Sequence, residues 1–348
     1  MHQDDRAPFD RALHGARVAA YAPGEFVGQE SFMTAGEIRA LAVQAGIGPG
    51  VSVLDVCCGI AGPGRFLTRE LGCDYLGVDA SASAVAIARE RASDLPCRFA
   101  VAQIPPLPAG SFDVVLLLET MLAFADKDAL AGGIGAALRP GGRFAFTLEE
   151  GAPLTAAERA AMPDADTVWL TPLDALTATL ERAGLAITWQ EDHSRAHRAT
   201  AQALADAFAA DADAIAARIG RVALDDLLAA HRRWIEWLDT GRVRKFALVA
   251  ERRSAGARDA FEDPGRKGHV PRMPDVSVLE RPGVDRAAVA HQVTEARLAQ
   301  FDGRPLVQGL QPRRDHRVVE HPAEPLLVGD VALDVERKRI AVRQHPAE

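Results

Sequence analysis

Short apolar runs alternate with longer amphipathic stretches along residues 51–250. Short runs rich in Val, Leu and Ile are typical of buried strands, and apolar residues at every third or fourth position are typical of helices. The predicted strands are 51–57, 75–79, 98–102, 112–119, 143–148, 185–190 and 243–250. The predicted helices are 65–71, 82–92, 129–138 and 172–183. This alternation predicts a doubly wound α/β fold, with a mostly parallel seven-stranded sheet and helices on both faces.

The segment 193–240, before the last predicted strand, is rich in Ala and predicts a helical insertion into this fold. Apolar residues recur there at helical spacing, and Trp234 and Trp237 are three positions apart, on one face of a helix. This pair either packs the insertion onto the sheet or lines the ceiling of a substrate pocket that the insertion covers. The two interpretations are compatible.

The composition changes near Ser254 and divides the chain into two parts. All four Trp and both Tyr precede this position, whereas residues 254–348 contain nine of the 21 Pro and five of the ten His. No sustained helical or alternating apolar period appears there. Such a segment buries too little apolar surface to offset the entropy of ordering it. We therefore predict one folded domain over 1–253 and a largely disordered tail over 254–348.

Composition and charge narrow the class of protein further. The chain is 48% hydrophobic and 25% charged, as in ordinary soluble proteins. No apolar run reaches the roughly 18–20 residues of a membrane span, and the first residues lack the features of a signal peptide. We therefore expect a cytoplasmic protein with no membrane partner. The net charge of −8 argues against a nucleic-acid partner, and none of the four cysteines forms a C-x-x-C pair typical of zinc sites.

A glycine-rich turn follows the first predicted strand and is the first candidate for chemistry. Gly59, Gly62 and Gly64 have no Cβ, so the turn can bend sharply and bring its backbone close to a ligand. Asp55 lies near the end of that strand, and Asp79 ends the next one, where a carboxylate can accept hydrogen bonds from a ribose. Glycines and an acid in this order fit a nicotinamide dinucleotide as well as an adenosyl cofactor.

Four segments together are more specific than the turn alone. Residues 53–62 (VLDVCCGIAG) resemble the first motif of class I S-adenosylmethionine-dependent methyltransferases, and residues 78–81 (VDAS) are similar to the acidic end of their second strand. Residues 110–115 (GSFDVV) resemble the entry to their fourth strand, and residues 138–144 (LRPGGRF) the turn before their fifth. The resemblance covers residues 40–150 well, and implies S-adenosyl-L-methionine as the cofactor and a small molecule as the methyl acceptor.

The resemblance also implies roles for matching residues. The methionine part of the cofactor would contact the turn around Gly59, the ribose would bind Asp79, and Asp55 would support the turn. Glu119, at the end of the fourth strand, would face the sulfonium. The implied cofactor-binding set is Asp55, Cys57, Gly59, Ala61, Asp79, Ala80, Gln103 and Glu119. Cys57 and Ala61 replace glycines usual in the family, and Gln103 stands where many relatives have an Asp for the adenine amine.

The N-terminal segment 1–35 resembles the lid of small-molecule methyltransferases, such as those acting on phosphoethanolamine, glycine derivatives or prenyl acceptors. Its aromatic residues Tyr21, Phe26 and Phe32 could close over the cofactor and exclude water. An arm that tucks these side chains into a surface groove is the alternative. The predicted substrate-binding residues are Tyr21, Phe32, Met121 and Trp234.

Methyl transfer from a sulfonium is an in-line displacement, so a base is required only where the acceptor arrives protonated. The predicted catalytic residues are His193, Glu149 and Glu119, with His193 ranked first because a near-neutral pKa suits proton removal. His197 and Glu150 are further candidates. His193 and His197 could share a metal ion if helical, but no third ligand is evident, so we predict no metal.

Two other classes of function remain open from the sequence alone. A protein of this kind could bind S-adenosylmethionine without catalysis, as a sensor or binding module. It could also be another α/β enzyme, such as an NAD-dependent oxidoreductase. Binding of S-adenosylmethionine and of NAD distinguishes the oxidoreductase from the other two classes, and turnover then distinguishes the methyltransferase from the module.

Overall fold

A computed structural model of the chain describes residues 6–108, 110–162 and 165–253. The predicted disordered tail, 254–348, lies outside the described residues. The strands are β1 (Ser52–Val56), β2 (Asp74–Asp79), β3 (Arg98–Val101), β4 (Phe112–Leu117), β5 (Leu138–Glu150), β6 (Leu185–Asp192) and β7 (Arg244–Arg252). The helices of the α/β core are α2 (Ala35–Gln44), α3 (Gly62–Leu71), α4 (Ala82–Arg91), α5 (Lys127–Ala137) and α7 (Leu173–Arg182). A short helix α6 (Ala156–Ala161) and the 3-10 turns Met121–Ala123 and Ala165–Thr167 lie between them.

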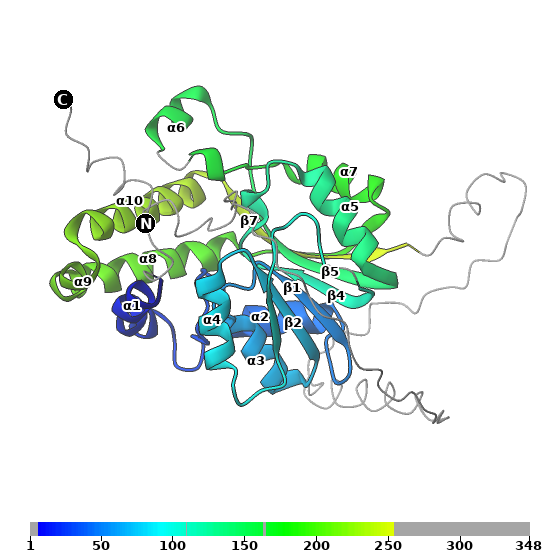
Figure 1. Ribbon diagram of the computed structural model, residues 1–348. Helices are drawn as coiled ribbons and strands as arrows, with labels where there is room; N and C mark the ends of the chain where they lie inside the picture. Colours follow the sequence, from blue (N-terminus) through cyan, green and yellow to red (C-terminus); the bar gives the residue numbers. More distant parts are fainter. Residues whose placement is uncertain (1–5, 109, 163–164, 254–348) are drawn as a thin grey trace, which may run out of the picture. The chain divides into compact units, whose positions relative to one another are not determined.

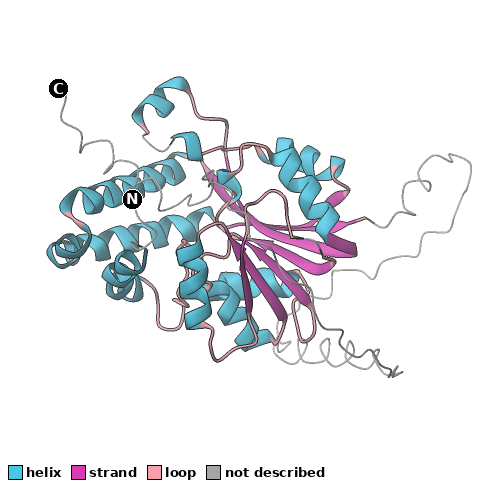
Figure 2. Cartoon of the chain, viewed as in Figure 1, coloured by secondary structure: helices cyan, strands magenta, loops and turns pink. Residues whose placement is uncertain are grey.

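The seven strands form one mixed sheet in the order β3-β2-β1-β4-β5-β7-β6 (Figures 1 and 2). β7 runs antiparallel to both of its neighbours, β5 and β6, and the pairs among β1 to β5 are parallel. The chain leaves β1 toward β2 on one side and returns to β4 on the other. Ligands of doubly wound sheets bind beyond the carboxyl ends of the strands at such a reversal.

Helices cover both faces of the sheet, as the alternating pattern predicts. α2, α3 and α4 lie on one face, where Ile38, Leu67 and Val85 join a buried cluster with alternate strand residues. α5 and α7 lie on the other, with Ile134 and Leu180 in a second cluster (Figure 1). Strands covered on both faces need continuous apolar runs, which explains why the sequence marks them clearly.

The largest difference from the predicted elements lies at the fifth strand. The sequence predicts a breaker turn at 140–142 and a strand that begins at 143, whereas β5 already begins at Leu138. Phe112 pairs with Leu138, and the next paired positions are Val114 and Arg143, so the intervening residues bulge out of the ladder. The glycines therefore mark a bulge inside the strand pairing and not its end.

Four helices form a separate layer, which we call the helical cap. They are α1 (Arg6–Ala20), α8 (Ser194–Ala210), α9 (Ala212–Ile219) and α10 (Arg221–Thr240). The last three are the predicted insertion, and the first belongs to the predicted lid. Leu13, Tyr21, Phe208 and Leu224 share one buried cluster, so the N-terminal segment packs against the insertion (Figure 1). None of the helices in the described part of the chain is long and apolar enough to cross a membrane.

Candidate functional site

The turn after β1 has left-handed backbone conformations, which glycine favours, at positions occupied by residues other than glycine. Among the described non-glycine residues, the positive φ angles are those of Cys57 (61°), Ala61 (59°) and Glu119 (61°). All three lie just beyond the carboxyl ends of β1 and β4, at the reversal in strand order. A left-handed residue with a Cβ costs about 1–2 kcal/mol, and such strain gathers at functional sites.

Asp79 holds this turn in place from the end of β2. Its Oδ2 accepts a hydrogen bond from the Gly59 N–H at 2.9 Å, and its Oδ1 accepts one from the Ser81 N–H at 2.8 Å. The side chain is buried and lies beside the glycine turn, where the resemblance places a ribose. Ala80 follows at the surface of the same bend, between β2 and α4.

Asp55, which the resemblance places in support of the turn, is hydrogen-bonded to a neighbouring strand. Its Oδ2 accepts a hydrogen bond from the Tyr75 hydroxyl at 2.5 Å, beneath the glycine turn and shielded from solvent. Burial raises the pKa of Asp55 to about 7, with the Tyr75 hydroxyl opposing the rise and the charge of Asp79 adding to it. The carboxylate that receives a hydrogen bond from the turn is Asp79.

The predicted lid passes directly over the start of α3. A Cβ on Gly62 would lie 2.3 Å from the carbonyl carbon and oxygen of Gly28, so the two backbones touch there. Gln29 fixes this crossing, since its amide donates hydrogen bonds to the carbonyl oxygens of Glu25 at 2.9 Å and Met33 at 2.7 Å. The absence of a side chain at Gly62 therefore allows the N-terminal segment to close against the turn.

A buried charge cluster lies where β4 and β5 end and where the antiparallel strand β7 begins. Lys245 Nζ lies 2.6 Å from Glu119 Oε1 and forms a second, short ion pair with Glu149. Burial lowers the pKa of Lys245, but the two carboxylates outweigh it and the net pKa is raised. Burial likewise raises the pKa of Glu119, and Lys245 outweighs it so that the net pKa is lowered. Both effects favour the charged forms.

The cluster forms one end of a cavity of about 210 Å³ between the sheet and the helical cap. Its polar lining includes Arg17, Tyr21, Glu119, Glu149, His197 and Lys245. Its apolar lining includes Phe32, Leu122, Val168, Leu204, Phe208, Trp234 and Leu238. Apolar walls with a few convergent charges are typical of a pocket for a small organic molecule.

Three of the four predicted substrate-binding residues, Tyr21, Phe32 and Trp234, line this cavity. The fourth, Met121, is packed into the core beneath it, and its neighbour Leu122 reaches the cavity instead. Trp234 also meets the Trp237 ring edge-on at 5.4 Å. Trp234 lines the cavity, whereas Trp237 packs the insertion against a buried cluster that includes Val168 and Val243.

The remaining candidates are distributed around this centre. Glu119 and Glu149 line the cavity, as does His197, whereas His193 lies behind it. Gln103 is exposed just after β3, and Glu150 pairs with Arg244 of the neighbouring strand β7 at 3.0 Å.

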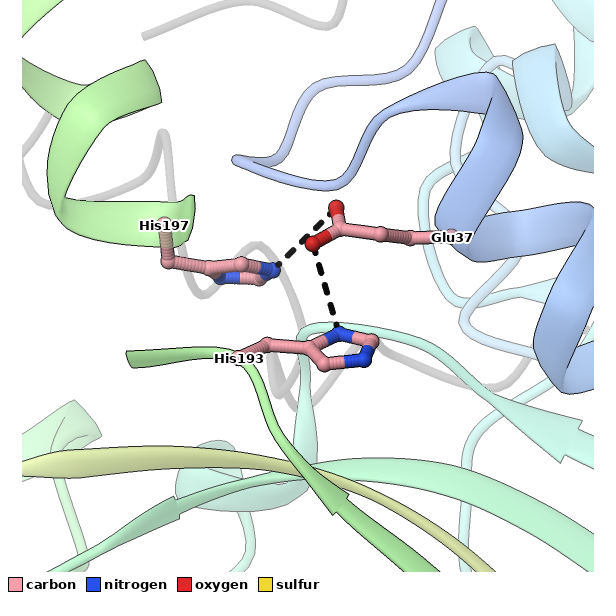
Figure 3. Close-up of side chains that lie close together, drawn as sticks. All are labelled: Glu37, His193 and His197. Atoms are coloured by element: carbon pink, nitrogen blue, oxygen red, sulfur yellow. Dashed lines mark ion pairs between the residues drawn. The ribbon is translucent and has the colours of Figure 1, made fainter. Parts of the chain in front are cut away.

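His193 and His197 converge with a residue that the sequence does not connect to them, Glu37 of α2 (Figure 3). Glu37 Oε1 lies 3.4 Å from His193 Nδ1, and its Oε2 lies 3.6 Å from His197 Nε2. Burial raises the pKa of Glu37, but His197 and the Thr34 N–H outweigh it and the net pKa is lowered.

Sequence reasoning missed two residues of this region, Lys245 and Glu37. Alternation along the last strand could have identified Lys245, because Val243, Ala247 and Val249 share its buried face. No local signal could have identified Glu37, since its partners lie in a distant part of the chain.

The comparisons with known proteins agree with the motifs. Residues 53–142 match the family model described as a methyltransferase domain. The methyltransferase GfsG of Streptomyces halstedii is 31% identical over 175 residues, which cover 47% of this chain and 62% of that protein. Phosphoethanolamine N-methyltransferase 3 of Arabidopsis thaliana is 36% identical over 103 residues, 28% of this chain and 21% of the relative. These matches identify residues 53–142 as a methyltransferase domain and agree with the resemblance of the motifs to class I S-adenosylmethionine-dependent methyltransferases.

Solved structures show the same fold over a larger part of the chain. The cyclopropane synthase MmaA2 of Mycobacterium tuberculosis has a TM-score of 0.62 at 13% identity, over 72% of this chain and 95% of that one. The [4+2]-cyclase SpnF has a TM-score of 0.57 at 23% identity, over 72% of this chain and 96% of the cyclase. The fold thus extends beyond the matched segment, whereas the chain spans only about a fifth of the length of the phosphoethanolamine enzymes.

Proposed function

We propose that this protein transfers a methyl group from S-adenosyl-L-methionine to a nitrogen, oxygen or carbon nucleophile of a small, largely apolar molecule bound in the cavity. The single observation that carries the proposal is the turn after β1, held by Asp79 and bordered by Gly59. It lies where the family binds its cofactor, and it follows a strand that pairs directly with β4. S-adenosylmethionine supplies the methyl group and a sulfonium leaving group.

The residues around the turn fit this cofactor. Gly59 presents backbone without a side chain, and Asp79 places a carboxylate, which can accept several hydrogen bonds, beside that turn. Glu119 lies at the end of β4 with its carboxylate ionised by Lys245, which suits the neighbourhood of a positive sulfonium. The segment 21–33 closes over the turn at Gly28 and would exclude water from the reaction.

The acceptor would bind in the cavity, between Trp234 and the buried charge cluster. As its nucleophile takes the methyl group, the carbon–sulfur electron pair leaves with sulfur, and a protonated nucleophile must also lose a proton. Glu149 Oε2 is buried at the cavity and has no hydrogen-bond partner among the described residues. We therefore rank Glu149 ahead of His193, which does not line the cavity, as the acceptor of that proton.

The first experiment is calorimetric titration of the full chain with S-adenosylhomocysteine and, separately, with NAD. We expect one molecule of S-adenosylhomocysteine to bind and NAD not to bind. Asp79→Ala should weaken the affinity by about 10-fold or more, since a buried hydrogen bond to a charged group contributes about 1.5–3 kcal/mol. The exposed carboxylate Asp94 provides the matched control, Asp94→Ala. A folded protein that binds no S-adenosylhomocysteine would overturn the proposal.

The second experiment distinguishes an enzyme from a binding module. Methyl transfer from labelled S-adenosylmethionine is measured against a panel of apolar amines, phenols and activated carbon acids. We expect turnover with at least one class, and Glu149→Gln should lower kcat for acceptors that arrive protonated while S-adenosylhomocysteine affinity stays unchanged. Tight binding of the cofactor without turnover on any of these classes would favour the non-catalytic module.

A further inference from the structure

We propose that Glu37, His193 and His197 form a binding site for one divalent transition-metal ion of the zinc type. The site lies at the cavity wall that His197 forms, and its affinity for a metal ion does not depend on methyl transfer. Two imidazoles and one carboxylate are a ligand set that zinc and its neighbours in the first transition series accept. The sequence alone identifies two of these residues, His193 and His197, and predicts no metal because no third ligand is evident from it. The fold supplies that ligand from α2.

The distances between the donor atoms suit a shared ion. His193 Nδ1 lies 3.4 Å from one Glu37 oxygen, and His197 Nε2 lies 3.6 Å from the other. One donor atom from each of the three residues lies within 4.8 Å of the other two. Donors on a tetrahedral zinc with bonds of about 2.0–2.1 Å are about 3.4 Å apart. These nitrogen–oxygen separations are longer than good hydrogen bonds, which have a mode near 2.9–3.0 Å.

Each histidine also directs its second nitrogen toward another carboxylate. His193 Nε2 lies 3.5 Å from Glu191 Oε2, and His197 Nδ1 lies 4.0 Å from Glu119 Oε2. Histidine ligands of metal ions typically donate their other ring N–H to a carboxylate, carbonyl or water. Glu191 and Glu119 lie on the side of each ring where such a partner belongs, at separations longer than a hydrogen bond. His193 Nδ1 and His197 Nε2 therefore both face the Glu37 carboxylate, where the ion would bind.

The nitrogens concerned are buried without hydrogen bonds. His193 and His197 are 7% and 1% exposed. In the described part of the chain, His193 Nδ1 and both ring nitrogens of His197 have no hydrogen-bond partner. Buried polar atoms without partners are rare and costly, and a site for an ion is one recognised explanation. A metal ion between the three side chains would satisfy the nitrogens that face Glu37.

The charge of the surroundings favours a dication as well. Glu37 and Glu119 both lie near His197, and Glu119 and Glu149 pair with Lys245. Three carboxylates and one ammonium give these four side chains a net charge of about −2 when both histidines are neutral. Protonation of the two histidines is the other way to balance this charge. That alternative predicts no metal affinity, so a titration with metal ions separates the two.

Secondary structure holds the ligands in place before any ion binds. Glu37 belongs to a capping box, in which its Oε2 accepts the Thr34 N–H at 2.8 Å and its own N–H donates to Thr34 Oγ1 at 3.2 Å. His193 precedes the first turn of α8, and His197 follows four residues later on the same side of that helix. A bound ion would thus join α2 to the helical cap beside the cavity wall that His197 forms.

The test uses the full chain, stripped with a chelator, and titrated with Co²⁺ as a spectroscopic probe followed by Zn²⁺. We expect one Co²⁺ per chain, visible d–d absorption typical of four or five ligands, and its displacement by Zn²⁺. Glu37→Gln and the double variant His193→Ala/His197→Ala should each weaken Co²⁺ binding by about 100-fold or more, beyond what loss of an outer partner costs. His14→Ala, at an exposed histidine of α1, is the matched control and should bind as the unmodified chain does.

Glu191→Gln provides a graded test, since Glu191 is 55% exposed and its replacement does not disturb the core. It should weaken Co²⁺ binding by about 10-fold if Glu191 supports His193 as an outer partner. Circular dichroism and S-adenosylhomocysteine titration of each variant report folding and cofactor binding separately from metal binding. Absence of Co²⁺ and Zn²⁺ binding by the unmodified chain overturns the proposal. So does one-to-one binding that survives both Glu37→Gln and the double histidine variant.

Discussion

Asp55 is a carboxyl group that the fold removes from water, and its titration should appear in the stability of the protein. Burial raises its pKa from 3.8 to about 7. Between these values the folded state keeps a proton that the unfolded state releases, so increasing pH favours unfolding. We expect the free energy of unfolding, relative to Asp55→Asn, to fall from about pH 4 to about pH 7 by at most about 4 kcal/mol and then level off.

Chemical denaturation of both proteins across this pH range measures the difference. Asn at position 55 keeps an oxygen that can accept the Tyr75 hydroxyl. Titrating groups remote from position 55 are common to the two proteins and cancel. A difference that does not change with pH would mean that Asp55 is ionised in the folded state, and would contradict the prediction.

Lys245 should be far more important for stability than its neighbour Arg244. Lys245→Met leaves Glu119 and Glu149 buried without their cation, and breaking a buried pair in this way costs about 3–5 kcal/mol. Arg244→Met, the matched control, removes an exposed pair with Glu150 and should cost less than about 1 kcal/mol. Urea denaturation gives both values.

A double-mutant cycle tests whether the buried charges act as a unit. Glu149→Gln removes one of the two carboxylates that Lys245→Met would leave unpaired. The two substitutions together should therefore cost less than the sum of the single costs, by at least about 1 kcal/mol. Additive costs would show that Glu149 and Lys245 do not interact in solution.

The contact between the N-terminal segment and α3 depends on one missing side chain. Gly62→Ala would place a Cβ 2.3 Å from the backbone of Gly28 and should displace residues 27–29 from the glycine turn. We expect a loss of about 1–3 kcal/mol in the free energy of unfolding, as for overpacked positions, together with weaker binding of S-adenosylhomocysteine.

Gly132 of α5 is the matched control, since nothing lies within 4 Å of a Cβ built there. Gly132→Ala should stabilise the protein by about 0.5–1 kcal/mol, because alanine loses less backbone freedom in a helix. Thermal denaturation and calorimetry are measured on both variants. Equal behaviour of the two variants would mean that the segment does not close on the turn.

The elements of the sheet could be predicted because buried strands require apolar runs and the turns between them require glycine or proline. The bulge before Arg143 could not be predicted. Glycines indicate that the backbone changes direction, but they do not indicate whether strand pairing extends across that change. The glycine turn and Asp79 are local to one motif and were recognisable from spacing. Glu37 meets His193 and His197 only through tertiary packing, which no local pattern records.

The described part of the molecule divides into a sheet that carries the family motifs and a helical cap that forms much of the cavity. The turn, Asp79 and Glu119 belong to the sheet, whereas Leu204 and Trp234 belong to the cap. The family model matches residues 53–142, which include nearly all of β1 to β4 and no part of the cap. Under the proposed function, residues outside this match would select the acceptor. Cofactor affinity and acceptor choice should therefore respond to different substitutions.

Trp234→Ala tests this division at the cavity wall. Removing the indole enlarges the cavity and takes away a large apolar contact, so KM for the best acceptor of the panel should rise by about 10-fold or more. Acceptors larger by a few carbons should gain in kcat/KM relative to that acceptor. The affinity for S-adenosylhomocysteine should stay within about two-fold of that of the unmodified chain, because the residues of the sheet are unchanged. Trp169→Ala is the matched control, because Trp169 stacks with Arg159 outside the cavity lining. If Trp234→Ala weakens S-adenosylhomocysteine and acceptor binding equally, then the cap also forms the cofactor site, and the division between sheet and cap is wrong.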